Sequence, residues 1–444
     1  MDWSRLISDK RLGMERFHDP RNHTRSDFQR DYDRMVFSSP FRRLQNKTQV
    51  FPLPGSIFVH NRLTHSLEVA SVGRSMANEI VNLLLERQRP EAEKRVLESI
   101  GEIVSAACLA HDLGNPPFGH SGEKAISTFF SEGEGSVLRD SLTPAQWADL
   151  VHFEGNANAL RVLTHKFHGR RTGGFAMTYP MLASIVKYPY SSGLAGEKNK
   201  FGFFTSEHDT YLRIAGELGL PRLEAPEGEL HFARHPLVYI VEAADDICYE
   251  VMDLEDAHKL KILDSPTVID LFLDFIPEER RERCRKIMST ISDPNEQIAY
   301  LRSGVIGEMV TACARAFAEN EQAILDGTFR GRLLSRMPRR LCDAYERCNA
   351  ISWDRVYRAR EVVEVELAGN RIISFLLEKL IHAVCHPELN YSRLLLSQVP
   401  DQYDVSSPLL FSKIQGVVDH VSAMTDVYAL NLFRKLNGMS LPAV

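Results

Sequence analysis

The chain has 444 residues, of which 44% are hydrophobic and 25% are charged, a balance that is ordinary for a folded protein with a large core. Its formal net charge of −6 argues against a surface devoted to nucleic acid. Its seven cysteines lack CxxC spacing and no run of about 18 apolar residues occurs, so we expect neither a zinc ribbon nor a membrane span.

Helical periodicity dominates the sequence, which predicts an all-α protein. The first clear helix covers 64–86, where Val72, Met76 and Ile80 recur at core spacing. A second covers 97–112 and ends at a Gly-Asn-Pro-Pro turn. Further helices are predicted over 146–167, 235–259, 265–275, 277–291, 293–302, 306–325, 336–348, 355–382 and 408–436.

Strand signals are few, and short ribbons are predicted only at 174–178, 229–233 and 326–332. The segment 168–234 is the least regular part and is rich in Gly, Ser, Tyr and Lys. A long irregular stretch in a compact protein is usually a functional loop or a disordered insertion. The aromatic and basic residues of this segment favour the functional loop.

The chain shows no internal repeat and no low-complexity tract. Helices continue on both sides of residue 262, so a sharp domain break is not expected there. We predict a catalytic core within residues 1–262 and a helical extension, 263–444, packed on that core.

Four side chains, His65, His111, Asp112 and Asp245, are suited to one divalent metal. His65 starts a predicted helix, and His111 and Asp112 end another just before a bend. Asp245 lies in an apolar helix, where a carboxylate is costly to bury without a partner. Taken singly, these residues also fit a hydrogen-bonded core histidine, a chance His-Asp pair or a solvated Asp245-Asp246 face. Two imidazoles and two carboxylates can hold a metal that keeps positions open for water and substrate.

The order of these residues, with the segments around them, resembles the HD-domain phosphohydrolases, and specifically the deoxynucleoside triphosphate triphosphohydrolases of the dGTPase-like family. The matching segments are RDYDRMVFSSPFRRLQNKTQVFPL (30–53), NRLTHSLEV (61–69), AHDLGNPPFGHSGE (110–123), HFEGNANALRVL (152–163), KYPYSS (187–192), EAADDICYEVMDLED (242–256) and VSAMTDVYA (421–429). Residues 260–350 carry no recognised motif. The resemblance implies the HD-domain helical fold with few short strands.

The resemblance also implies that the four side chains are metal ligands. It selects Asp245 over Asp246 because the family's aspartate is followed by a tyrosine four residues later and an aspartate eight residues later. The mixed nitrogen and oxygen ligands suit Mn²⁺, Fe²⁺, Co²⁺ or Ni²⁺, with Mg²⁺ accompanying the triphosphate. The implied reaction is attack at the α-phosphorus of a dNTP, releasing a deoxynucleoside and inorganic triphosphate.

His120 and Glu123 are the predicted catalytic pair. They lie three residues apart, a spacing at which side chains meet on a helix, and a carboxylate beside an imidazole raises its pKa. We expect His120 to be the general acid for the leaving 5′-oxygen and Glu123 to orient it, although His120 could instead only cap the helix. Some relatives carry a further histidine where this chain has Asn115, which makes His120 more important here.

Four residues are expected to serve the phosphates. Arg62 and Lys187 match phosphate-binding residues of the family, although Lys187 alone would be read as a surface lysine. His152 and Glu154 are expected near the phosphates as supporting groups.

Three residues are expected to serve the sugar. Tyr249 and Asp253 match positions that line the deoxyribose, where a ring packed against C2′ leaves no room for a 2′-hydroxyl. Gln49 matches a residue that reads the 3′-hydroxyl, because an amide both donates and accepts.

Two alternatives of function stay open from the sequence. The first is another HD enzyme, such as a 5′-nucleotidase, a cyclic-nucleotide phosphodiesterase or a guanosine tetraphosphate hydrolase. The second is a non-catalytic nucleotide sensor or DNA-binding oligomer, which would have no need of an open metal. A P-loop enzyme is disfavoured because GxxxxGK[ST] is absent.

The resemblance further implies a homo-oligomer, with a hexamer favoured, and for some members an allosteric dNTP or single-stranded DNA as partner. The basic clusters 42–47, 166–171, 280–286 and 336–340 could bind such anions, but they also fit ordinary solvated faces. The chain shows no apolar signal segment, so we expect a cytoplasmic protein.

Overall fold

The structure, a computed structural model, describes residues 1–16, 25–51 and 59–439. The last two residues of the 30–53 motif therefore lie outside the described residues. Within the described ranges, nearly all regular structure is helical and β-structure is limited to isolated bridges. The predicted all-α fold class is confirmed.

The helices are α1 Trp3–Leu6, α2 Asp27–Val36, α3 Ser39–Arg43, α4 Arg62–Leu85, α5 Glu91–Leu97, α6 Ile100–Ala110, α7 His120–Ser131, α8 Pro144–Val151, α9 Gly155–Thr164, α10 Tyr179–Ser184, α11 His208–Leu218, α12 Val238–Lys259, α13 Ser265–Phe275, α14 Glu278–Met288, α15 Pro294–Glu319, α16 Glu321–Leu325, α17 Arg339–Ile351, α18 Arg360–Cys385, α19 Asn390–Leu396, α20 Leu410–Ser422 and α21 Asp426–Leu436. The shorter turns are the 3₁₀ helices η2 Leu44–Asn46, η3 Glu134–Ser141, η4 Ser192–Leu194, η5 Thr205–Glu207 and η6 Leu333–Arg336, and the π-helix η7 Ser352–Val356.

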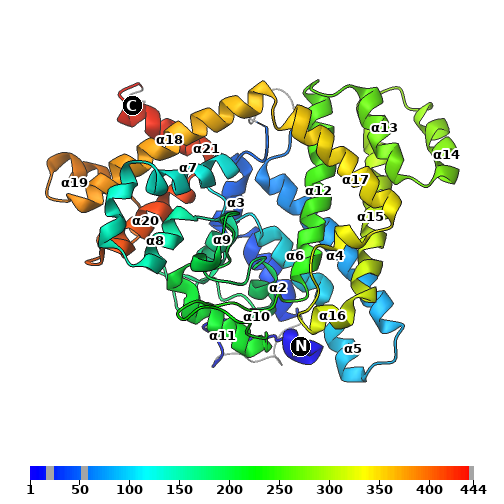
Figure 1. The fold of residues 1–444 in the computed structure, drawn as a ribbon, viewed down its shortest axis with the longest axis horizontal. Coiled ribbons are helices and arrows are strands. Elements are labelled where there is room, and N and C mark those ends of the chain that lie inside the picture. The colour runs from blue at the N-terminus through cyan, green and yellow to red at the C-terminus, as the bar shows by residue number, and fades with distance from the viewer. Residues whose placement is uncertain (17–24, 52–58, 440–444) are drawn as a thin grey trace.

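Two antiparallel helices, α4 and α6, build the centre of the fold (Figure 1). α4 begins sharply because Asn61 and Thr64 form a capping box, in which each side chain accepts the backbone N–H of the other. Farther along, Gly73 lies so close to α6 that a Cβ there would stand 2.6 Å from the sulfur of Cys108. This close packing sets the first turn of α4 beside the end of α6.

α12 and α15 pack against α4 and complete the centre, so helices from both halves of the chain share one hydrophobic cluster. A second cluster joins α7–α9 to α18–α21. In Figure 1, α18 runs along one edge of the molecule beside α7 and α21. The C-terminal helices thus pack directly on the segment that follows the His-Asp turn. The domain boundary between 262 and 263 remains a prediction.

Two predicted helices proved to be interrupted. The helix predicted over 146–167 is split into α8 and α9, because the Glu154 carboxylate accepts the backbone N–H groups of Asn156 and Ala157 and so starts a new helix. The helix predicted over 408–436 is split into α20 and α21, because the Thr425 hydroxyl caps the second one. In both cases a polar capping residue overrides a continuous apolar pattern.

The opposite error occurred at residues 293–325, where two helices were predicted. α15 runs unbroken through Gly304 and the short α16 follows it. A glycine inside a helix costs only about 1 kcal/mol relative to alanine, and buried Leu301, Val305 and Met309 outweigh that cost. Seven further helices were not predicted, namely α1, α2, α3, α5, α10, α11 and α19, and α7 was expected only as the helix that follows Gly119.

The predicted ribbons at 174–178, 229–233 and 326–332 are wrong as strands. Among the described residues, the first segment contributes one isolated bridge, Arg11 to Thr178, and the second contributes two, Tyr190 to His231 and Arg222 to Phe232. The segment 168–234 also contains α10 and α11. The seven cysteines, all within the described residues, are free thiols. No described helix has the length and apolar character needed to cross a bilayer.

Candidate metal and catalytic site

Three of the four predicted metal ligands meet where α4 begins, α6 ends and α12 passes. The ligand atoms of His65, His111 and Asp245 all lie within 4.8 Å of one another. Asp245 Oδ1 lies 3.1 Å from His65 Nε2 and 3.5 Å from His111 Nε2. The two imidazole rings are 5.3 Å apart with planes inclined by 62°, and one nitrogen of each ring belongs to this group of ligand atoms.

The orientation of His111 fits a metal ligand. Its Nδ1 lies 2.6 Å from the carbonyl oxygen of Cys108, one turn back on α6, and therefore carries the proton in the neutral ring. Its Nε2 then presents a lone pair to the centre of the cluster. This nitrogen is buried and has no hydrogen-bond partner among the described residues. A buried unpaired acceptor is costly, and a divalent cation would satisfy it.

Asp112 lies at the edge of this cluster. Its Oδ1 is 3.7 Å from His111 Nε2 and also accepts from the Asn115 side chain. Its Oδ2 accepts from Arg62 at 2.8 Å. The carboxylate is therefore held by two donors, and one of its oxygens faces the cluster.

The buried charges in the cluster shift one another's pKa. Burial opposes the charge of His111, but Asp112 and Asp245 outweigh it and raise its pKa to about 9. Burial likewise opposes the charge of Asp245, yet His111 and His65 hold its pKa well below the usual value. Without a cation, a proton on His111 therefore balances the ionised carboxylates, and a divalent ion that binds there would take the place of that proton.

His120 and Glu123 form the predicted pair in the first turn of α7. His120 Nδ1 lies 2.9 Å from Glu123 Oε2, while the other carboxylate oxygen accepts the Gly155 N–H at 2.7 Å. The carboxylate raises the pKa of His120. The His120 side chain keeps 71% of its surface exposed, whereas that of Glu123 keeps 10%. A buried carboxylate thus holds an accessible imidazole.

Arg62 and Gln49 border this pair. Arg62 is buried, and its Nε has no hydrogen-bond partner within the described part of the chain; the same holds for the Gln49 Oε1. Gly119, just before His120, has φ of +59° and lies where a Cβ would stand 2.5 Å from an Arg62 nitrogen. Only glycine fits this position, and the two unsatisfied polar groups are free to take a ligand.

Lys187 lies beside α12, close to the metal cluster. Its ammonium is 3.2 Å from Glu242, one turn before Asp245 on α12. Burial opposes its charge, but the nearby acids, Glu242 and Asp246 foremost, raise its pKa. Lys187 therefore remains a cation beside the cluster.

The structure adds Lys200, which was not predicted. Its ammonium lies 2.8 Å from Glu154. Burial opposes the charge of Lys200, but the nearby carboxylates of Glu154 and Glu123 outweigh it and raise the pKa. Glu154 itself is the cap of α9, so its first task is structural. His152 lies 2.7 Å from the side chain of Asn199, and no hydrogen bond or ion pair joins it to the metal cluster in the described part of the chain. The only hint of Lys200 in the sequence was the lysine content of the irregular segment.

Tyr249 and Asp253, one and two turns after Asp245, are joined by a residue that the sequence did not single out. The ring of Tyr357 stacks on Tyr249 at 5.9 Å, and its hydroxyl donates to Asp253 at 2.8 Å. Burial raises the pKa of Asp253 well above its usual value. The three side chains form one polar and aromatic wall.

A cavity of about 720 Å³ adjoins the site and is strongly cationic. Its lining includes Lys187 and Lys200, together with Arg234 and Arg332 from farther along the chain. Arg332 pairs with Asp246 at 3.1 Å. A cleft lined in this way suits a ligand with several negative charges.

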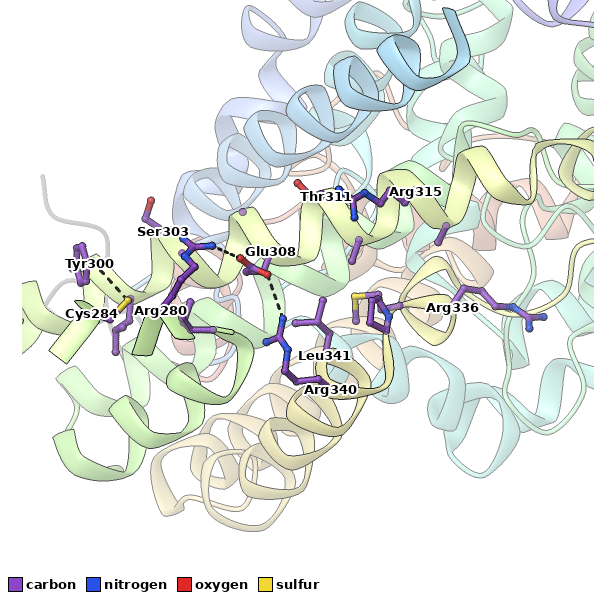
Figure 2. A pocket seen from close by; sticks show the side chains of 18 of the residues that line it. Arg280, Cys284, Tyr300, Ser303, Glu308, Thr311, Arg315, Arg336, Arg340 and Leu341 are labelled. Atoms are coloured by element: carbon purple, nitrogen blue, oxygen red, sulfur yellow. Dashed lines mark hydrogen bonds and ion pairs between the residues drawn. The ribbon is translucent and has the colours of Figure 1, made fainter. Parts of the chain in front are cut away.

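A larger cavity of about 1090 Å³, shown in Figure 2, contains none of the predicted site residues. It brings Arg280 and Arg340, from two of the basic clusters, to one carboxylate. Glu308 lies 2.6 Å from Arg280 and 3.3 Å from Arg340. The shared acid neutralises part of the charge, as expected for an ordinary solvated face.

Comparison with known proteins agrees with this geometry. The HD domain family model matches residues 62–148, and the Phosphohydrolase-associated domain model matches 335–435. The fold and the His-His-Asp cluster thus define a phosphohydrolase of the HD-domain class.

Relatives match over nearly the whole chain. A deoxyguanosinetriphosphate triphosphohydrolase-like protein of Pseudomonas aeruginosa is 37% identical, with 100% of both chains covered. A protein of the same description from Synechocystis is 34% identical, over 99% of this chain and 100% of its own. The deoxyguanosinetriphosphate triphosphohydrolase of Yersinia enterocolitica is 30% identical, over 92% of this chain and 93% of its own. The chain belongs to the deoxyguanosinetriphosphate triphosphohydrolase-like family.

Proposed function

We propose that this protein is a metal-dependent dNTP triphosphohydrolase, with dGTP among its substrates. The observation that supports this most directly is the buried His111 Nε2, which faces His65 and Asp245 without a hydrogen-bond partner in the described structure. The names of the relatives add the substrate class. Water would add to the α-phosphorus while the bond to the 5′-oxygen breaks, giving a deoxynucleoside and inorganic triphosphate.

His65, His111, Asp112 and Asp245 would hold the metal, with Mn²⁺, Fe²⁺, Co²⁺, Ni²⁺ and Mg²⁺ as candidates. A bound divalent ion polarises a phosphoryl oxygen and lowers the pKa of its water. No other described group of three or more His, Cys, Asp or Glu side chains meets the same distance limit. The donor set, two imidazole nitrogens with carboxylate oxygens, is one that such ions accept.

The remaining residues have roles that follow from their positions. Protonated His120 would give its proton to the leaving 5′-oxygen, and Glu123 would keep the imidazole charged and oriented. Arg62, Lys187 and Lys200 would neutralise the triphosphate.

The wall of Tyr249, Asp253 and Tyr357 would face the deoxyribose, and Gln49 would read its 3′-hydroxyl. Glu154 supports Lys200. His152 is assigned only a place near the phosphates.

The test is incubation of the purified protein with Mn²⁺ and each dNTP, alone and mixed, followed by chromatography of the products. Inorganic triphosphate supports the proposal, whereas orthophosphate or pyrophosphate assigns the protein to another type of HD hydrolase. A His111→Ala variant is the matched control, since it removes a ligand. Activity that appears only in mixtures would identify an allosteric dNTP.

We also propose a homo-oligomer, with a hexamer favoured, and single-stranded DNA as a further partner to be tested. Light scattering after gel filtration measures the number of subunits. A binding titration at several salt concentrations measures the affinity for single-stranded DNA.

A further inference from the structure

The C-terminal helices hold the two loops that carry the proposed catalytic residues. Asp426, in the first turn of α21, is buried and accepts two backbone hydrogen bonds from distant loops. One oxygen accepts the Thr48 N–H at 2.7 Å and the other the Phe118 N–H at 2.9 Å. Thr48 directly precedes Gln49, and Phe118 lies two residues before His120. A single carboxylate thus joins both loops.

The second of these loops is strained, so it needs such support. Phe118 has φ of +62° and the next residue, Gly119, has φ of +59°. A positive φ is unfavourable at a bulky residue and persists only when its surroundings enforce it. Besides Asp426, α18 provides that enforcement: a Cβ at Gly369 would stand 2.7 Å from the Phe118 Cβ.

A second buried contact links the same elements. The ammonium of Lys47 donates to the Asn115 carbonyl at 2.5 Å and to the Ser422 carbonyl, at the end of α20, at 2.8 Å. The Lys47 carbonyl in turn accepts the N–H of Arg62. The loop before Gln49, the turn after the metal ligands and the C-terminal helices therefore share one buried network.

We propose that Asp426 is a positioning residue for catalysis. By holding two backbone amides, it fixes the loop that aims His120 at the leaving oxygen and the loop that presents Gln49 to the sugar. This inference rests on the proposed function, but it makes a structural statement that can be tested without turnover. It gives the C-terminal helices a part in the chemistry, although no metal ligand comes from them.

Asp426→Asn is the variant of choice, because the amide has nearly the same shape but only one oxygen to accept the two N–H groups. Asp419→Asn is the matched control. Asp419 also ties the C-terminal helices to the core, through two hydrogen bonds from Arg161, but it touches neither loop. In that control, Arg161 still donates a hydrogen bond to Glu207.

Asp426→Asn is expected to lower kcat for dNTP hydrolysis about 10- to 100-fold, because a shift of about 1 Å in a catalytic group costs that much. Metal content should be unchanged. Asp419→Asn should lose a similar amount of thermal stability and stay within about twofold of wild-type kcat. Gly369→Ala, which presses on Phe118 from the other side, should lower kcat in the same way as Asp426→Asn.

A double-mutant cycle separates positioning from general damage. If Asp426 acts in part through His120, Asp426→Asn slows the His120→Ala enzyme by a smaller factor than it slows wild type, and the loss that remains is the part that acts through the Gln49 loop. Fully multiplicative losses in the cycle, or an equal loss of kcat in Asp419→Asn, would overturn the inference.

Hydrogen exchange provides a readout that does not depend on substrate. Peptides covering residues 47–51 and 115–123 should exchange faster in Asp426→Asn than in both Asp419→Asn and wild type. Unchanged exchange there also overturns the inference. If wild type releases no triphosphate but the two peptides still exchange faster in Asp426→Asn, the proposed function is wrong. The inference that Asp426 holds the two loops is then still supported.

Discussion

Replacing His120 by alanine isolates the proton-transfer step from metal binding. The side chain is 71% exposed, so its removal leaves no cavity, and the buried Glu123 carboxylate keeps its hydrogen bond from the Gly155 N–H. A positioned general acid contributes about 10²- to 10⁴-fold, which equals about 3 to 5 kcal/mol of transition-state stabilisation. His120→Ala should therefore keep its metal and its melting temperature but lose turnover by that factor.

The assay measures triphosphate release and metal content on the same preparation. His386→Ala is the matched control, because His386 is also an exposed histidine beside a glutamate, at 3.5 Å from Glu388. A second substrate sharpens the test: an aryl phosphodiester with a 4-nitrophenolate leaving group needs no proton, so His120→Ala should hydrolyse it nearly as fast as wild type does.

Turnover of dNTP by His120→Ala within tenfold of wild type would refute the assignment. Equal losses on dNTP and on the aryl ester would also refute it, because they would mean that His120 serves binding or folding. His111→Ala should behave differently from His120→Ala, because it removes a proposed metal ligand and should lose metal and turnover together.

Three further outcomes are expected. Since Glu123 raises the pKa of His120, Glu123→Gln should make kcat fall at a lower pH on the alkaline side, as a pH–rate profile will show. Removing metal with a chelator should abolish activity and lower the melting temperature, and Mn²⁺ should restore both, because a ligand that binds only the folded state stabilises it; calorimetry checks this. Asp256 and Glu68 outweigh burial and raise the pKa of His60 to about 10, so its stabilising contribution is full below about pH 6.5 and is lost as pH rises toward 10. Urea unfolding should show that loss in wild type but not in His60→Gln.

The helical fold could be predicted because periodicity reports which face of each helix is buried. The same signal cannot locate interruptions that a polar cap decides. The side chain of Glu154 caps α9 and so separates it from the helix before it, and Thr425 caps α21 in the same way. Gly304, in contrast, does not interrupt α15. A local sequence pattern shows well which residues are buried. It does not show which polar side chains compete for the backbone N–H groups that a continuous helix would use.

For the site, spacing along the chain predicts pairs that are neighbours in sequence, whereas His65 and Asp245, which meet across 180 residues, were joined only by the order of the motifs and the family resemblance. His120 and Glu123 meet because they share one helical turn. Tyr357, Lys200 and Asp426 were missed because each acts across more than 40 residues of chain, on Asp253, Glu154 and Phe118 respectively. Asp426 did lie in a matching motif, but no local rule gives a carboxylate that role.

The buried polar contacts explain why the matching segments span most of the chain. The metal cluster takes its side chains from α4, α6 and α12, yet the turn between α6 and α7 is shaped by groups from α20 and α21. Such contacts stabilise little on balance and cost much when broken, because an orphaned buried group loses its solvation. A change in α21 would therefore reach the proposed catalytic loops without touching a proposed metal ligand, and we expect the segment 335–435 to contribute to the site through these contacts.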